Sequence, residues 1–158
     1  MKILVISDTH GIIYDAQNII KKYEKNVEMC IHLGDLVKDA IYLQSRFPNL
    51  KFEIVRGNND FTKDFPTEKI IELGGKKILI THGHMYSVKS TYDLIVNHAK
   101  AFRVDACFFG HTHQQEEFYS DGILFLNPGS LAFSRDGSRS FAIAEVTPYG
   151  VVAYLEKV

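Results

Sequence analysis

The fold is decided by the stretch Lys2-Ile3-Leu4-Val5-Ile6-Ser7-Asp8-Thr9-His10-Gly11. Residues 2–6 show no alternation of polar and apolar side chains, which predicts a short strand buried on both faces. A carboxylate and an imidazole follow at Asp8 and His10, and Gly11 lets the backbone turn freely. Carboxylate and neutral imidazole are ligands that first-row divalent metals accept. Taken alone, this turn is explained equally well by an Asp that caps it beside a surface His.

Strands and helices are predicted to alternate in the first part of the chain. Apolar residues recur at helical spacing over residues 12–25 and 36–47. Short apolar runs at 29–33 and 52–55 predict two more strands. This order is typical of parallel βαβ units.

The rest of the chain is predicted to be richer in strands. The pair Gly74-Gly75 fits a two-residue hairpin between strands 69–73 and 76–80. One more helix is predicted over residues 88–102, and further strands at 105–109, 116–119, 123–126, 140–146 and 151–156. We therefore expect one domain, residues 1–158, with the architecture of an α/β sandwich whose helices lie outside two sheets.

Composition and charge narrow the function classes. The formal net charge of −1 provides no basic field, so nucleic acid binding is not expected. Cys30 and Cys107 lie inside apolar runs and are expected to be buried, reduced thiols. No apolar stretch approaches the roughly 18 residues of a transmembrane helix, and the N-terminus enters a strand rather than a signal peptide. We expect a cytoplasmic protein without membrane association.

Five predicted strands end in residues of metal-binding type. Ligands of parallel α/β sheets bind beyond the carboxyl ends of the strands, and right-handed crossovers bring these ends to one edge. Side chains far apart in sequence are therefore expected to meet in one cleft. The candidates are Asp8 and His10, Asp35, Asn58, His82, and His111 with His113.

This set of candidates indicates two metal ions. Two carboxylates among seven ligands suggest that a carboxylate is shared between the ions. Two divalent ions about 3.5–4 Å apart hold a hydroxide and clamp the oxygens of an in-line displacement at phosphorus. The two ions carry four positive charges, and Asp8, Asp35 and the hydroxide carry three negative charges, so the net charge of the site is +1. That charge suits a phosphate diester monoanion, and a monoester dianion stays open.

The strand ends carry five motifs in a fixed order: Asp8-x-His10, Gly34-Asp35, Gly57-Asn58-x-Asp60, His82-Gly83-His84 and Gly110-His111-x-His113. In these motifs the chain resembles the calcineurin-like metallophosphoesterases. The short length and Asn127-Pro128-Gly129-Ser130 look closest to the small YfcE-like phosphodiesterases. The resemblance covers nearly the whole chain and implies two mixed β-sheets packed face to face with helices on the outside. It also implies a dinuclear metal-dependent phosphodiesterase that attacks phosphorus with metal-activated hydroxide.

The resemblance also implies roles for individual residues. One ion would be held by Asp8, His10, Asp35 and His113, and the other by Asn58, His82 and His111, with Asp35 bridging the two. Asp60 would orient a neighbouring group. Mn²⁺ is the expected ion, with Fe, Ni, Co or Zn as alternatives, because imidazoles and carboxylates do not choose among them.

Asn59 departs from the family pattern, in which a His or a Cys stands at this position. An Asn donates a hydrogen bond to phosphate but has no proton to transfer near neutral pH. General acid catalysis typically contributes about 10²–10⁴-fold. We therefore expect strong dependence on leaving-group acidity, with aryl diesters preferred over alkyl monoesters. His84 is a candidate replacement for the acid, so Asn59, Asp60 and His84 are the catalytic candidates.

Other polar residues have competing explanations. His32 is expected to be a buried supporting imidazole rather than a ligand, and His98 a solvated residue on a helix. Arg56 either faces phosphate or forms a surface salt bridge. Arg135, Asp136, Gly137 and Arg139 are typical of a polar turn, for which a substrate role is the less favoured alternative.

A non-catalytic function is the main alternative to the enzyme. The retromer complex contains a subunit of this fold that serves as a scaffold, so the fold alone does not establish activity. All seven ligand positions are occupied by competent side chains, which favours the enzyme. A nuclease that acts on polynucleotides is disfavoured by the small size and mild acidity. The expected partner is a small phosphate ester, and a homo-oligomer is compatible with the sequence.

Overall fold

The structure, a computed structural model, describes residues 1–134 and 137–158. Its elements follow the chain as β1 (Lys2–Ile6), α1 (Tyr14–Tyr23), β2 (Met29–His32), α2 (Val37–Arg46), β3 (Lys51–Ile54), β4 (Glu68–Leu73), β5 (Lys76–Thr81), the short 3₁₀ helix η1 (His84–Tyr86), α3 (Asp93–Phe102), β6 (Ala106–Phe108), β7 (Gln115–Ser120), β8 (Ile123–Pro128), β9 (Ser140–Thr147) and β10 (Gly150–Lys157). The predicted turn at Arg135 and Asp136 lies outside the described residues.

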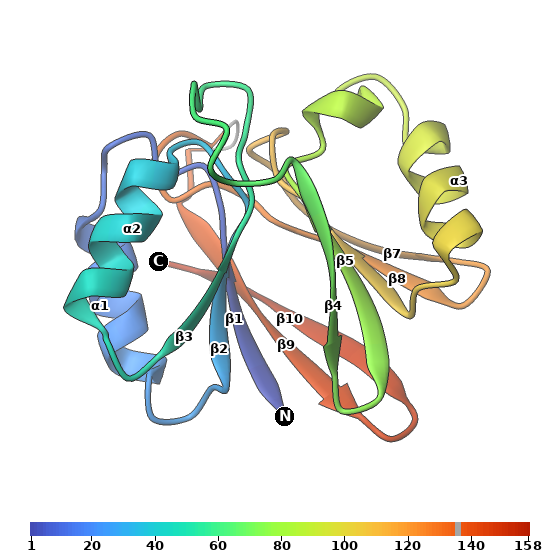
Figure 1. The fold of residues 1–158 in the computed structure, drawn as a ribbon, viewed down its shortest axis with the longest axis horizontal. Helices are drawn as coiled ribbons and strands as arrows, with labels where there is room; N and C mark the ends of the chain where they lie inside the picture. Colours follow the sequence, from blue (N-terminus) through green and yellow to red (C-terminus); the bar gives the residue numbers. More distant parts are fainter. Residues whose placement is uncertain (135–136) are drawn as a thin grey trace.

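The strands form two mixed sheets packed face to face, with the helices on the outside, as expected (Figure 1). The first sheet has the order β10-β9-β1-β2-β3, and the second β4-β5-β6-β8-β7. Strands β1, β2 and β3 are parallel, and so are β5, β6 and β8. Each sheet therefore has three parallel strands whose carboxyl ends lead into loops at the upper side of Figure 1.

Apolar residues of β1 alternate between two separate layers of core. Ile3 and Val5 pack between the two sheets, and Leu4 and Ile6 pack beneath α1 and α2. All four side chains are fully buried, which confirms a strand covered on both faces. A third layer lies between the second sheet and α3. Burial on both faces fixes the register of β1 and so fixes where Asp8 emerges.

The hairpin predicted at Gly74-Gly75 is present between β4 and β5, which pair antiparallel. Both glycines have positive φ, 56° and 75°. A two-residue hairpin turn of this kind requires left-handed backbone at both central positions, which glycine adopts without steric cost.

The helix predicted over residues 88–102 begins later than expected. Helix α3 starts at Asp93, and η1 ends just before Ser87, whose φ of 52° is incompatible with a continuous helix. Val88 is buried in the same apolar layer as α3, so its helix-like spacing from the apolar residues of α3 reflects shared packing and not a continuous helix. The other two α-helices begin and end within two residues of their predicted bounds.

Two further observations concern the cysteines and the helices. Cys30 and Cys107 are buried free thiols, and burial raises the pKa of both. In the described part of the chain, none of the helices combines the length and apolarity needed to cross a bilayer.

Candidate metal centre

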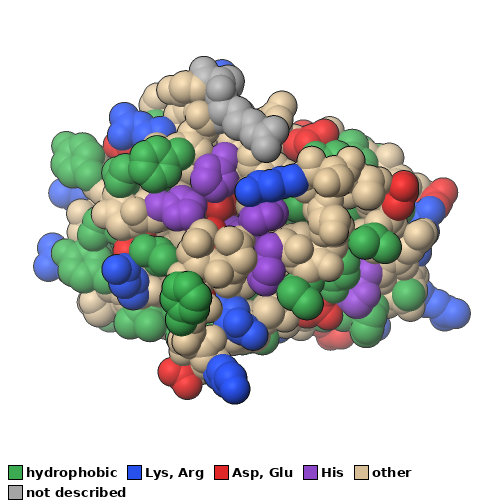
Figure 2. Space-filling view, turned by 90° about the horizontal axis from the view of Figure 1, so that it is seen from above, with side chains coloured by type: hydrophobic (Ala, Val, Ile, Leu, Met, Phe, Trp, Pro, Cys, Tyr) green, Lys and Arg blue, Asp and Glu red, His purple; other side chains and the backbone are tan. Residues whose placement is uncertain are grey.

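Imidazoles and carboxylates gather where the carboxyl ends of the two sheets meet. Seen from above, His side chains surround a central carboxylate, and basic side chains lie beside them (Figure 2). Two groups of donor atoms have the spacing needed to hold a metal ion. The first is Asp8, His10 and His113, and the second is Asp8, Asp35 and His82.

The first group joins the loop after β1 to the loop after β6. Asp8 Oδ1 lies 3.1 Å from His113 Nε2 and 3.7 Å from His10 Nε2. The two imidazole Nε2 atoms are 3.3 Å apart. Three donor atoms from two sheets thus point at one position.

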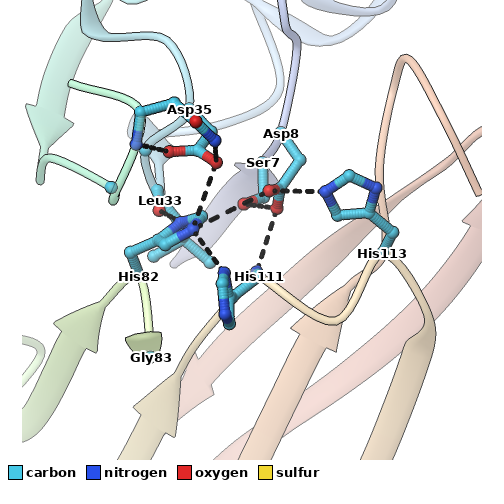
Figure 3. Close-up of polar contacts among 12 residues, drawn as sticks. Ser7, Asp8, Leu33, Asp35, His82, Gly83, His111 and His113 are labelled. Carbon is cyan, nitrogen blue, oxygen red and sulfur yellow. Dashed lines mark hydrogen bonds and ion pairs between the residues drawn. The ribbon is translucent and has the colours of Figure 1, made fainter. Parts of the chain in front are cut away.

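The second group lies on the other side of Asp8. His82 Nε2 is 3.5 Å from Asp35 Oδ2 and 3.9 Å from Asp8 Oδ1 (Figure 3). His111 Nδ1 approaches the same His82 nitrogen at 3.1 Å. Asp35 Oδ2 is also 3.8 Å from His10 Nε2, so its carboxylate faces imidazoles of both groups. Asp8 is common to both groups, whereas the resemblance assigned the bridging role to Asp35.

The orientation of His82 leaves a lone pair inside this cluster. Its Nδ1 lies 2.7 Å from the carbonyl oxygen of Leu33, so Nδ1 carries the proton and donates it there (Figure 3). Nε2 then presents a lone pair toward the carboxylate oxygens of Asp8 and Asp35. The ring is fully buried, so water does not separate these like partial charges. A bound cation would resolve this repulsion, and a second hydrogen bond that fixes the tautomer is typical of metal-binding histidines.

Asp8 is held so that one oxygen remains free. Its Oδ2 accepts hydrogen bonds from the Ser7 hydroxyl and from the backbone N–H of His111. Its Oδ1 is buried and accepts no hydrogen bond from the residues that the structure describes. Burial alone would raise the pKa of this carboxyl, but His10 and His113 hold the pKa far below its usual range. An ionised carboxylate oxygen of this kind is a suitable ligand for a divalent cation, so the residues present fit a bound metal ion.

The imidazoles differ in how the cluster changes their protonation. The nearby carboxylate of Asp8 raises the pKa of His10. Burial, with His82 as the next cause, lowers the pKa of His111 to about 4. A neutral imidazole is the form that binds metal, so His111 is ready to act as a ligand at neutral pH.

Five of the seven predicted ligands have left-handed backbone. The φ angles are 54° at Asp8, 44° at His10, 48° at Asp35, 70° at His111 and 57° at His113. This conformation costs an L-residue on the order of 1–2 kcal/mol, and such residues concentrate at functional sites. These turns lie in the loops whose donor atoms converge on the cluster.

Asp60 ties the loops after β2 and β3 together. Its carboxylate accepts hydrogen bonds from the backbone N–H groups of Asp35 at 3.0 Å, Val37 at 2.7 Å and Gly57 at 2.8 Å. The contact to Val37 satisfies a free N–H in the first turn of α2. Asp60 is buried and acts through the backbone it holds, which makes it a positioning residue.

Of the two neighbouring asparagines, Asn59 rather than Asn58 contacts Asp35. The side-chain amide of Asn59 donates to Asp35 Oδ2 at 2.6 Å, and its backbone N–H donates to Oδ1 at 3.0 Å. Asn58 is exposed on the same loop. The ligand role predicted for Asn58 stays a prediction.

The two remaining histidines of interest lie at different distances from the cluster. The His84 ring is 5.4 Å from that of His82 and 6.2 Å from that of His111, so His84 borders the site. His98 was expected to be solvated, which is wrong. It is half-buried between Tyr86 and Phe102, and its Nε2 lies 3.1 Å from Glu68 Oε1.

His32 has the supporting role expected for it. It is fully buried, its Nδ1 accepts from the backbone N–H of Gly34, and its Nε2 donates to the Thr9 hydroxyl at 3.1 Å. The Thr9 hydroxyl donates in turn to Asp39 at 2.7 Å, and Asp39 also accepts from the N–H of Gly11. Burial is the main cause that lowers the pKa of His32 to about 4. This chain of hydrogen bonds fixes the loop that carries Asp8 and His10.

Sequence reasoning missed the support given by the end of β8 and the loop that follows it. The Ser130 hydroxyl donates to the carbonyl of Asp8 at 2.8 Å. The Asn127 amide donates to the carbonyl of Gly110 at 2.9 Å and to the Thr112 hydroxyl at 3.0 Å. The motif Asn127-Pro128-Gly129-Ser130 contributes to the family resemblance, but its residue types do not indicate these partners, which lie 15 to 122 positions away in the sequence.

Fold and donor set together define a metal-binding α/β sandwich. Residues 1–148 match the calcineurin-like phosphoesterase superfamily domain. The chain is 38% identical over 136 residues to the probable metallophosphoesterase YsnB of Bacillus subtilis, covering 85% of this chain and 78% of that protein. It is 34% identical over 146 residues to the phosphodiesterase MJ0936 of Methanocaldococcus jannaschii, covering 82% and 83% respectively. The chain therefore belongs to the calcineurin-like phosphoesterase superfamily.

Solved structures show the same architecture. A predicted phosphoesterase from Streptococcus pneumoniae superposes with a TM-score of 0.78 at 27% identity, covering 98% of this chain and 97% of that one. Vps29 from Entamoeba histolytica, complexed with Zn²⁺, superposes with a TM-score of 0.77 at 23% identity, covering 100% and 98%. The second likeness concerns the fold alone.

Proposed function

We propose that this protein is a dinuclear metal-dependent phosphodiesterase that hydrolyses small phosphate diesters. The observation that carries the proposal is the pair of donor groups that share Asp8 at the common edge of two sheets. The name of the Methanocaldococcus relative supports a diester substrate. Mn²⁺ is the ion we propose to try first, because the donor types do not select among first-row ions.

The residues around the donor groups would hold the two ions and keep the ligands in place. Asp8, His10 and His113 would hold one ion, and Asp35, His82 and His111 face the position of the other. Bound divalent ions would lower the pKa of a water molecule and neutralise charge on the phosphate. The Leu33 carbonyl keeps His82 in its ligating tautomer, and Asp60 keeps the Asp35 loop in place.

Asn59 limits which leaving groups the site can expel. Its amide is bonded to Asp35 and carries no acidic proton, so the leaving oxygen departs without general acid help from this residue. We expect kcat/KM to fall steeply as the pKa of the leaving alcohol rises across a series of aryl methyl phosphodiesters. A flat dependence with chemistry rate-limiting would contradict this role of Asn59.

His84 is a weak candidate to replace the missing acid. Burial, with the neighbouring His82 as the next cause, lowers the pKa of His84, so the ring is mostly neutral at neutral pH. The His84→Gln variant separates the two cases. We expect it to leave the dependence on leaving-group pKa unchanged, whereas an acid would make that dependence steeper when removed.

A non-catalytic metal-binding scaffold is the second candidate function. The likeness to Vps29 in fold keeps this alternative in view. The integrity of the donor groups favours the enzyme, since a scaffold does not need paired groups with free lone pairs. A cytoplasmic location, the absence of nucleic acid and membrane partners, and a homo-oligomeric state stay predictions from the sequence.

The deciding experiment is a matrix of metals and substrates on chelated, reconstituted protein. Bis(4-nitrophenyl) phosphate, 4-nitrophenyl phosphate and cyclic nucleotides are each assayed with Mn²⁺, Ni²⁺, Mg²⁺ and Zn²⁺. We expect metal-dependent hydrolysis, with the aryl diester preferred to the aryl monoester. Binding of two ions without hydrolysis of any ester would instead favour the scaffold.

A further inference from the structure

A pocket lined by basic side chains opens beside the donor groups. Its volume is about 390 Å³, and Arg56, Lys63 and His84 line it together with Asn58. His84 also borders the metal cluster, with ring centroids 5.4 Å from His82 and 6.2 Å from His111. His84 therefore borders both the pocket and the proposed metal cluster.

Arg56 is unusual among the basic residues because part of its guanidinium is buried without a partner. Its Nε is inaccessible and makes no hydrogen bond within the described residues. No carboxylate there lies within ion-pair distance of Arg56, whereas Glu53 pairs with Lys51 and Lys69 at 2.9 and 2.6 Å. The salt bridge considered for Arg56 from the sequence is thus not seen in this part of the chain. A partly buried positive charge without a counter-charge is costly, and an anion bound in the pocket that Arg56 lines would offset it.

His84 supplies a second buried atom without a partner on the same pocket. Its Nδ1 is inaccessible and has no hydrogen bond in residues 1–134 and 137–158. Lys63, in the same loop between β3 and β4 as Arg56, adds an ammonium group to the lining. Arg56 and Lys63, which form no ion pair within the described residues, and the imidazole of His84 line one cavity, and such side chains are the chemistry of a site for phosphate oxygens.

The pocket and the metal cluster would each bind a negative charge of their own. Two divalent ions with a hydroxide would leave one positive charge at the cluster after the carboxylates of Asp8 and Asp35 are counted, which would match the single negative charge of a diester. The pocket adds two positive charges from Arg56 and Lys63 and one negative charge from Asp60, whose carboxylate is already held by three backbone N–H groups. A diester at the metal cluster leaves this net positive charge unused, and a terminal phosphate, which carries between one and two negative charges near neutral pH, balances it.

We propose that Arg56, Lys63 and His84 form an anion subsite for a second phosphate of the substrate. The substrate class is then a phosphodiester in which one of the two alcohols also carries a terminal phosphate. This inference rests on the proposed phosphodiesterase function, because the reacting diester occupies the metal cluster while its second phosphate occupies the pocket.

A pair of matched substrates tests the inference. Thymidine 5′-(4-nitrophenyl phosphate) and its 3′-phosphorylated form release the same 4-nitrophenol and differ only in the terminal phosphate. With Mn²⁺-loaded protein, we expect kcat/KM to be at least about tenfold higher for the 3′-phosphorylated substrate, because charge-assisted hydrogen bonds contribute that much or more. The ratio of the two kcat/KM values is the readout.

Variants locate the effect. Arg56→Gln and Lys63→Gln should each bring the ratio close to one. Lys21→Gln, which removes the charge of an exposed lysine near the end of α1, should leave it unchanged. Circular dichroism melts of each variant confirm that the fold is retained. A ratio near one in the unmodified protein, or a high ratio that persists in Arg56→Gln, overturns the subsite.

Failure of the proposed function gives a different result. If neither substrate is hydrolysed with any ion, the phosphodiesterase proposal fails, and calorimetry with thymidine 3′,5′-bisphosphate and thymidine 5′-monophosphate tests the subsite. At least about tenfold tighter binding of the bisphosphate, lost in Arg56→Gln, supports the subsite. Equal binding of the two nucleotides overturns it.

Discussion

The two sheets contribute different chemistry to one site. The loops of the first sheet supply the carboxylates Asp8 and Asp35, which are 0% and 1% exposed, together with His10. The second sheet supplies imidazoles, His82, His111 and His113. Each donor group combines members from both sheets, so neither sheet edge contains a complete group. The site therefore exists only when the sandwich is closed, and its donors report on how the two sheets are packed.

Replacement of the shared carboxylate should break this arrangement most severely. We expect Asp8→Asn to lose both ions and to lower kcat/KM on bis(4-nitrophenyl) phosphate by more than about 10²-fold, because loss of a partner outside the ligand set already costs 10–100-fold. His113→Asn removes a donor from the first group alone and should lose one ion. Metal content by mass spectrometry and steady-state kinetics check both variants. Two ions retained in Asp8→Asn would contradict the shared role.

The positioning role of Asp60 predicts a smaller effect within the first sheet. Asp60→Asn places an amide NH₂ against backbone N–H groups that now donate to a carboxylate. We expect metal affinity to fall roughly 10–100-fold. Asp64→Asn, on the exposed part of the same loop, is the matched control. A lower melting temperature with unchanged metal affinity would mean that Asp60 serves stability alone.

Close packing of the two sheet edges can be tested at Gly110. A Cβ at this position would lie 2.1 Å from Ser7 Oγ and 2.8 Å from Asp8 Oδ2. We expect Gly110→Ala to destabilise the fold by about 1–3 kcal/mol, which lowers the melting temperature by roughly 2–4 °C per kcal/mol. Gly75→Asn is the control, because the space around Gly75 is open and Asn tolerates its left-handed backbone. Equal melting temperatures for the two variants would show that the edges can move apart freely.

The buried His32, which supports the loop after β1, should make the stability of the fold depend on pH below about 6.5. The pKa of His32 is about 4 in the fold against 6.5 for an ordinary imidazole, so below pH 6.5 the unfolded chain takes up a proton that the folded chain does not. The free energy of unfolding therefore falls as pH decreases, by about 2 kcal/mol from this residue between pH 7 and pH 5. Urea unfolding of chelated protein at both pH values should show a smaller drop for His32→Gln. An identical drop in both proteins would rule out this contribution.

The parts of the fold that depend on local pattern were predictable from the sequence. Uninterrupted apolar runs predicted the buried strands, and Gly74-Gly75 predicted its hairpin. The strand-end rule predicted which side chains converge, and the structure brings Asp8, Asp35 and His82 together. Helix α3 was predicted to begin too early, because the burial of Val88 imitates helical spacing.

What the sequence could not reveal is the set of contacts between distant loops. The Ser130 hydroxyl reaches the Asp8 carbonyl across 122 positions, and no local pattern marks such a pair. The backbone turn after β3 decides whether Asn58 or Asn59 reaches Asp35. Because the two residues are adjacent and identical in type, the sequence does not indicate which one does so. The half-buried position of His98 likewise depends on Tyr86 and Glu68, which precede its helix.

The left-handed backbone at five predicted ligands restricts how this site can change. Aspartate and histidine are among the few residue types other than glycine that tolerate this conformation, and they are also metal ligands. Cysteine and glutamate bind metals but lack that tolerance. Exchange of one donor type for another would therefore disturb the path of the chain before it altered affinity for the ion, so new metal preferences are better sought in the surrounding residues than in the donors.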